Sequence, residues 1–180
     1  MRKLVGLFLL VAALSCPATA ASLFTGPYNA FNWTPLGFGN VDISGAPGDV
    51  VITGCDPFPG QQLFELTAIA SGTVSFDWSY TSYDWFNSGF DPFGYFVIEF
   101  GNVHQHQLSS NSGPNSQSGS ATFQVKVGDV FGFYVSNTDT QSNPAIATIS
   151  NFDGPLPDSP EPGTFLLLGA GLMCILLGKR

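Results

Sequence analysis

Apolar and polar side chains alternate along several short segments of this chain, and the alternation predicts β-strands. The clearest segment is 72–81, GTVSFDWSYT, whose large apolar side chains share one face: Val74, Phe76, Trp78 and Tyr80. Residues 120–128, SATFQVKVG, repeat the pattern with Ala121, Phe123, Val125 and Val127. Because successive side chains of a strand point to opposite faces, both segments are expected to be half-buried strands.

Similar runs recur between clusters of Gly, Pro, Asn and Ser, and they predict five further strands: 49–54, 62–70, 94–101, 129–137 and 145–152. One or two more short strands are expected within 21–48. Gly128 and Asp129 are expected to connect two strands tightly as a hairpin, and the polar stretch 108–120 to form a loop. No segment of 21–152 shows a helical period, so this domain is expected to be an antiparallel, jelly-roll-like β-sandwich.

The first twenty residues have the layout of a secretory signal peptide. Met1, Arg2 and Lys3 form a short basic region, 4–14 is an apolar run, and 18–20 (Ala-Thr-Ala) offers small residues before a cut at Ala21. The apolar run is too short for a comfortable membrane span. A lipoprotein cut at Cys16 is the rival, but Ala13 stands three residues before it, where lipoprotein signals favour Leu. We expect signal peptidase to remove 1–20.

The C-terminal part changes character twice. Residues 153–163, DGPLPDSPEPG, are proline-rich and are expected to form a stiff linker. Residues 164–178 are apolar, and as a helix they would span about 22 Å at 1.5 Å per residue, short of the roughly 30 Å of a bilayer core. Lys179 and Arg180 can snorkel to the interface and favour a cytoplasmic end. A single transmembrane helix is therefore expected at 164–178, followed by the basic end 179–180.

The end of the sequence resembles a known sorting signal. Pro160, Glu161 and Pro162, the apolar run and the basic pair resemble the PEP-CTERM signal of Gram-negative bacteria, over about 21 residues. The resemblance implies processing near the motif by an exosortase, a membrane-embedded cysteine protease. It also implies transient membrane anchoring, a final place on the cell surface or in the extracellular matrix, and an association with exopolysaccharide and biofilm formation.

Two other sorting signals compete with this interpretation. Leu156–Pro160 begins like a Gram-positive sortase signal but lacks its Thr-Gly pair. A eukaryotic lipid-anchor signal has a similar physical layout, and the Pro-Glu-Pro tripeptide favours the bacterial one. Separately, residues 72–152 are similar to a β-rich module of bacterial surface proteins, which implies a fold and a setting but no activity.

The exported body is strongly acidic. Between 21 and 159 the only base is Lys126, and the acids number twelve, for a net charge of 1 − 12 = −11: Asp42, Asp49, Asp56, Glu65, Asp77, Asp84, Asp91, Glu99, Asp129, Asp139, Asp153 and Asp158. Nucleic-acid binding needs clustered Lys and Arg, so nucleic acid is excluded as a partner. Of the two cysteines left after export, Cys174 lies in the apolar tail and Cys55 is expected to be a buried small residue.

Two groups of residues are weak candidates for a metal site. His104 and His106 share one face if extended, and a third ligand would have to be a carboxylate such as Glu99. Asp84, Asn87 and Asp91 are the best oxygen ligands for calcium, although no D-x-D-x-D run is present. The competing interpretation of the two histidines is a polar edge strand, and that of the acids is turn-forming side chains. No cofactor is therefore expected, and calcium is the one alternative to be tested.

Exposed aromatic rings could stack on sugars. Tyr83 and Trp85 lie in a loop-like stretch and are the candidates for ligand binding. Trp33, Trp78 and Tyr80 could stack on sugars in the same way, but packing in the core is the favoured interpretation of these rings. No GxSxG, P-loop or HExxH motif is present. The sequence therefore predicts a non-enzymatic exported surface protein, with a carbohydrate-binding module, calcium-assisted, as the alternative and a secreted glycan hydrolase as the third hypothesis.

Overall fold

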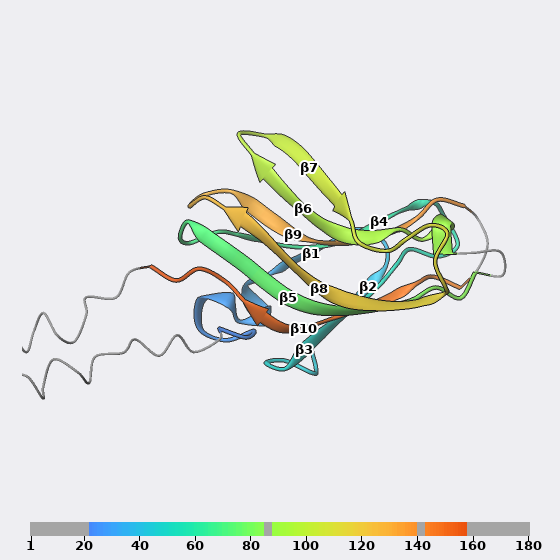
Figure 1. Ribbon diagram of the computed structural model, residues 1–180, viewed down its shortest axis with the longest axis horizontal. Coiled ribbons are helices and arrows are strands. Elements are labelled where there is room, and N and C mark those ends of the chain that lie inside the picture. Colours follow the sequence, from blue (N-terminus) through green and yellow to red (C-terminus); the bar gives the residue numbers. More distant parts are fainter. Residues whose placement is uncertain (1–21, 85–87, 140–142, 158–180) are drawn as a thin grey trace, which may run out of the picture. The chain divides into compact units, whose positions relative to one another are not determined.

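The computed structural model describes residues 22–84, 88–139 and 143–157, which form an all-β sandwich (Figure 1). Within these residues two five-stranded antiparallel sheets face each other, so the predicted fold is confirmed. The first sheet has the order β1 (Thr34–Leu36), β4 (Gly60–Thr67), β9 (Val130–Asn137), β6 (Phe93–Glu99), β7 (Asn102–Gln107). The second has the order β2 (Asn40–Asp42), β3 (Asp49–Thr53), β10 (Ile146–Asp153), β5 (Gly72–Thr81), β8 (Ser116–Val125).

Three short 3-10 turns complete the described elements: η1 (Gly26–Tyr28), η2 (Ala30–Asn32) and η3 (Ser88–Phe90). No helix among the described residues is long and apolar enough to cross a membrane. The predicted signal peptide, the predicted tail helix and most of the predicted linker lie outside the described residues.

Three predictions need correction. The turn at Gly128 and Asp129 is not a hairpin, because it joins β8 of the second sheet to β9 of the first. The segment 108–120 is not wholly a loop, because β8 begins at Ser116 and pairs with β5 from there, Ser116 opposite Thr81. β7 itself was not predicted. All six of its residues are exposed and it lies at the edge of its sheet, so its sequence NVHQHQ carries no alternation of apolar side chains.

The core between the sheets is built from aromatic rings. Trp33, which is 4% exposed, stacks on Phe64 and Phe133 of the first sheet at centroid distances of 5.1 and 5.7 Å. It meets Phe152 of the second sheet edge-on at 5.4 Å. Its indole N–H donates to the main-chain oxygen of Tyr28 at 3.1 Å. Trp33 therefore joins both sheets, and Trp78 and Tyr80 are also buried as predicted.

The antiparallel registers give the sandwich two distinct ends. We call one the exit end, because β10 leaves the sandwich there at Asp153. The β6–β7 turn and the β8–β9 turn (126–129) lie at the same end, since Val125 pairs with Gly72 and Val130 pairs with both Thr67 and Ile98. These turns and the end of β10 gather at the left of Figure 1. We call the opposite end the acidic end, for four carboxylates described below.

Because Trp33 contacts both sheets, truncating its side chain is expected to lower the free energy of unfolding strongly. Trp33→Ala should cost about 3–5 kcal/mol of unfolding free energy, because it removes a ring that contacts both sheets and leaves a cavity. Urea unfolding followed by circular dichroism measures this. The control is Phe31→Ala, two residues away and 84% exposed, which should change stability by about 0.5 kcal/mol or less. Equal losses in the two variants would contradict the assigned core.

Candidate functional site

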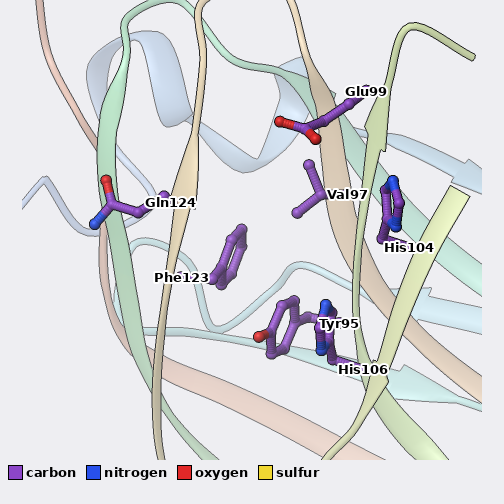
Figure 2. Close-up of a pocket in the computed structure, with 7 residues that line it drawn as sticks. All are labelled: Tyr95, Val97, Glu99, His104, His106, Phe123 and Gln124. Atoms are coloured by element: carbon purple, nitrogen blue, oxygen red, sulfur yellow. The ribbon is translucent and has the colours of Figure 1, made fainter. Parts of the chain in front are cut away.

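A pocket of about 230 Å³ opens between the β6–β7 hairpin of one sheet and β8 of the other (Figure 2). β7 and β8 are edge strands of their sheets, so the pocket lies along an open side of the sandwich. Seven residues line it: Tyr95, Val97, Glu99, His104, His106, Phe123 and Gln124.

Strand alternation explains why these side chains meet. Tyr95, Val97 and Glu99 are spaced by two on β6 and therefore share a face. Across the hairpin, His106 lies opposite Tyr95 and His104 lies opposite Val97. Directly opposite residues of an antiparallel pair place their side chains on the same face of the sheet. The register of one hairpin thus supplies five of the seven lining residues.

An aromatic stack forms the floor and one wall of the pocket. Tyr95 lies between Phe123, at 4.3 Å and 8°, and His106, at 4.9 Å and 14°. Phe76 of the core touches Tyr95 edge-on at 6.4 Å, so the stack rests on the interior. Burial raises the pKa of Tyr95, which keeps its hydroxyl neutral at physiological pH. His106 is the exposed outer ring of the stack.

The rim of the pocket is polar. Glu99 accepts from the Lys126 ammonium at 3.0 Å, and this hydrogen bond and charge raise the pKa of Lys126. Both side chains are exposed, so the pair adds little stability. It does join the β6–β7 turn to the β8–β9 turn. Together the pocket offers stacked rings, two imidazoles, a carboxylate and an amide, which are groups that stack on and hydrogen-bond to a small polar ligand.

The two predicted histidines are both in this pocket, on a polar edge strand. In the part of the chain that the structure describes, no group of three or more His, Cys, Asp or Glu side chains is arranged to hold a metal ion. Glu99, the carboxylate considered as a third ligand, is instead paired with Lys126. Metal binding by His104 and His106 stays a prediction.

The acidic end gathers a second set of predicted residues. Asp91 is 2% exposed and accepts the hydroxyl of Ser82 at 3.0 Å, and the same hydroxyl accepts the backbone N–H of Asp84 at 3.2 Å. Asp84 is 6% exposed, and its Oδ2 is buried with no hydrogen-bond partner. Ser82 thus connects Asp84 and Asp91, two of the three calcium-ligand candidates, and calcium binding there stays a prediction.

Burial controls the ionisation of these acids. It raises the pKa of Asp91 to about 6; the Ser82 hydroxyl opposes the rise, and the charges of Asp84, Asp139 and Asp56 add to it. Burial also raises the pKa of Asp84, with Asp139 adding to the effect. The acidic end therefore holds carboxylates that repel one another and resist losing their protons.

The other predicted site residues are placed as follows. Tyr83 is 56% exposed, as a ligand-stacking ring would be, but it is not in the pocket. Trp85, Asn87 and the motif residues Pro160, Glu161 and Pro162 lie outside the described residues. Tyr95, Phe123 and Gln124 were not predicted as site residues. Their alternation was visible, but only the pairing of β6 with the unpredicted β7 and the approach of β8 bring them together.

Comparisons with known proteins identify one sequence motif and a fold. Residues 160–180 match the family described as the PEP-CTERM protein-sorting motif, so the predicted sorting signal is confirmed. No curated protein matches the chain.

Several solved carbohydrate-binding modules have a similar β-sandwich. TmCBM61 in complex with β-1,4-galactotriose aligns with a TM-score of 0.44 and 9% identity, covering 75% of this chain and 97% of that one. A family 29 module complexed with cellulohexaose gives 0.43 and 12%, covering 68% and 80%. A family 35 module from Clostridium thermocellum gives 0.38 and 12%, covering 67% and 92%. At these identities the likeness concerns the fold alone.

The raised pKa of Asp91 predicts an unusual pH dependence of stability. Because the folded-state pKa of about 6 exceeds the usual value near 3.9, the folded protein takes up the proton first. Stability should therefore rise as the pH falls from 8 through 6 to 5, by roughly 1.4 kcal/mol. Thermal unfolding across this range measures it.

The matched variants separate Asp91 from the other acids. Asp91→Asn should flatten the rise, because the amide carries no charge to bury. Asp42→Asn should leave it intact, since Asp42 is exposed and its pKa is lowered by the backbone and hydroxyl of Ser44. A stability that falls steadily from pH 8 to 5 in the parent chain would show that the Asp91 assignment is wrong.

Proposed function

We propose that this chain is a non-enzymatic, exported protein of the cell surface or extracellular matrix, delivered through its C-terminal sorting motif. The supporting observation is the PEP-CTERM match at 160–180. In this proposal signal peptidase removes 1–20, the apolar run 164–178 holds the chain in the membrane, and an exosortase-type enzyme acts at Pro160, Glu161 and Pro162. The destination is the exopolysaccharide matrix of a Gram-negative bacterium.

The end of the sandwich suits processing at that motif. The Tyr28 hydroxyl donates to the main-chain oxygen of Pro155 at 2.6 Å, and Gly154 N–H donates to the Ser22 hydroxyl at 2.8 Å. These bonds tie the last described residues to the first. A cut within 160–162 would leave Gly154 and Pro155, and with them these bonds, on the folded domain.

Intact mass of the protein from its native host tests this delivery. We expect a form that starts at Ala21 and ends within 160–164 in the surface or medium fraction. Added mass on that form would indicate transfer to a glycan or lipid. Glu161→Ala should instead give a membrane-bound form that runs through Arg180, while Pro157→Ala, before the motif, should be processed normally. A parent chain that runs through Arg180 in the membrane would reject the sorting proposal.

A second candidate function is polysaccharide binding at the pocket. It is favoured by the stack of Phe123, Tyr95 and His106, beside the polar groups of Glu99 and Gln124. Sugar rings combine apolar C–H faces, which pack on aromatic rings, with hydroxyls that need hydrogen-bond partners. The pocket is smaller than the roughly 300–1,000 Å³ of sites for larger ligands, so we propose that it takes a single ring of a chain.

Glycan-array binding with point variants tests the pocket. His106→Ala should weaken binding about tenfold, the equivalent of 1.4 kcal/mol, because it removes the exposed ring of the stack. Gln105→Ala is the matched control, since Gln105 is the neighbouring exposed residue on the opposite face of β7.

Tyr83→Ala and Trp85→Ala test the aromatic residues that the sequence singled out. Loss of binding in these variants alone would place the sugar site at that loop and reject the pocket. Binding unchanged in all four variants would also reject it.

A further inference from the structure

The exit end carries large apolar side chains that nothing in the sandwich covers. Phe100 is 93% exposed, Val127 is 65% exposed and Val103 is 57% exposed. Phe100 lies on the β6–β7 turn, Val103 follows on β7, and Val127 lies on the β8–β9 turn. We call these three residues the apolar tip.

Phe100 occupies a backbone position that favours other residues. Glu99 pairs with Asn102, so Phe100 and Gly101 form a two-residue turn with φ of +50° and +81°. Turns of this kind favour Asn-Gly, because both central residues need positive φ. A phenylalanine there costs of the order of 1 kcal/mol and buries nothing in return. Neither the turn nor the core therefore explains an aromatic side chain at position 100.

An ion pair and hydrogen bonds connect the turns that carry the apolar tip. Lys126 joins the two turns through Glu99 at 3.0 Å. Val127 N–H donates to the Ser71 hydroxyl at 2.9 Å, and Gly128 N–H donates to the Ala68 oxygen at 2.9 Å. These bonds connect the β8–β9 turn to the β4–β5 turn, so the exposed side chains of Phe100 and Val127 lie on a joined set of three turns.

Charge distinguishes the apolar tip from other exposed rings. The carboxylates beside it are occupied: Glu99 pairs with Lys126, and Asp129 accepts the backbone N–H of Lys126 at 2.8 Å. Lys126 is also the only base between 21 and 159. By contrast, Phe38 and Phe58, which are 93% and 73% exposed, lie toward the acidic end, where four carboxylates act on one another. Lipid phosphates would be repelled there.

Chain connectivity keeps the exit end near the sorting tail. The described chain ends at Pro157, after β10 has left the sandwich, and six residues, 158–163, precede the apolar run 164–178. Six residues reach at most about 22 Å when fully extended. Whatever surface holds the apolar run is therefore within reach of the exit end.

We propose that the apolar tip inserts into the lipid interface of the membrane that holds the tail, so that Phe100 and Val127 orient the sandwich while the sorting motif is processed. This inference rests on the membrane anchoring in the proposed function. Apolar side chains on projecting turns gain free energy on leaving water, and Lys126 pairs with Glu99, so this carboxylate does not face the lipid phosphates unpaired. Because the whole body is acidic, the surface it fits is zwitterionic rather than anionic lipid.

The test places a reporter tryptophan at each end of the full chain. Phe100→Trp and Phe38→Trp are matched, since both positions are 93% exposed. Each variant and the parent chain are reconstituted in phosphatidylcholine vesicles with and without brominated acyl chains, and the parent signal is subtracted. The expected result is strong quenching of the tryptophan introduced at position 100 and none at position 38. Val127→Trp provides a second reporter if Phe100→Trp does not fold.

Vesicle flotation of the same samples separates this inference from the proposed function. A parent chain that does not float would overturn membrane anchoring and the insertion with it. A chain that floats with neither position quenched, or with both quenched equally, would overturn insertion alone. Insertion would also be overturned if the tryptophan at position 100 were not quenched and Phe100→Asn were processed poorly in cells. That combination would indicate that the apolar tip contacts a protein. Phe100→Asn keeps the turn, since asparagine is favoured there.

Discussion

The two sheets are held face to face by aromatic rings and by no covalent link within the described residues. Trp33 contacts both sheets, and its stacked and edge-on pairs each add about 0.5–1.5 kcal/mol beyond the area they bury. Cys55, the one cysteine of the described chain, is buried and free. An exported domain could use disulfides, and this one depends instead on ring packing that begins with its N-terminal segment.

The same aromatic packing connects the first described residues of the domain to the end of β10. Phe24 stacks on Phe152 at 5.0 Å, and Tyr28 touches the same ring at 5.4 Å. Ser22 N–H donates to Asp153 at 2.8 Å, so the segment that completes the core also holds the end of β10. The core then supports the pocket, because Phe76 contacts both Phe133 in the interior and Tyr95 beneath the pocket. A loosened core would disturb the pocket and the chain exit together.

The sequence predicted the parts of the fold that bury one face. β5 matches its predicted range of 72–81, whereas the hairpin predicted at Gly128 and Asp129 is wrong, because that turn crosses from β8 of one sheet to β9 of the other. β7 could not be predicted, because an exposed edge strand has no apolar face to alternate. The same reason limited the site: His104 and His106 were recognised by residue type, whereas Tyr95 and Phe123 became site residues only through a register and a sheet-to-sheet approach that a single sequence does not contain.

The two ends of the sandwich differ in the free energy they contribute to the folded state. At the acidic end, Asp84 and Asp91 are buried near other acids, so ionising them at neutral pH costs stability. At the exit end, Glu99 and Asp129 are paired, and three turns are joined by hydrogen bonds. Local opening begins where stability is lowest. At neutral pH the acidic end should therefore open first, while the exit end, where β10 leaves the sandwich, stays folded.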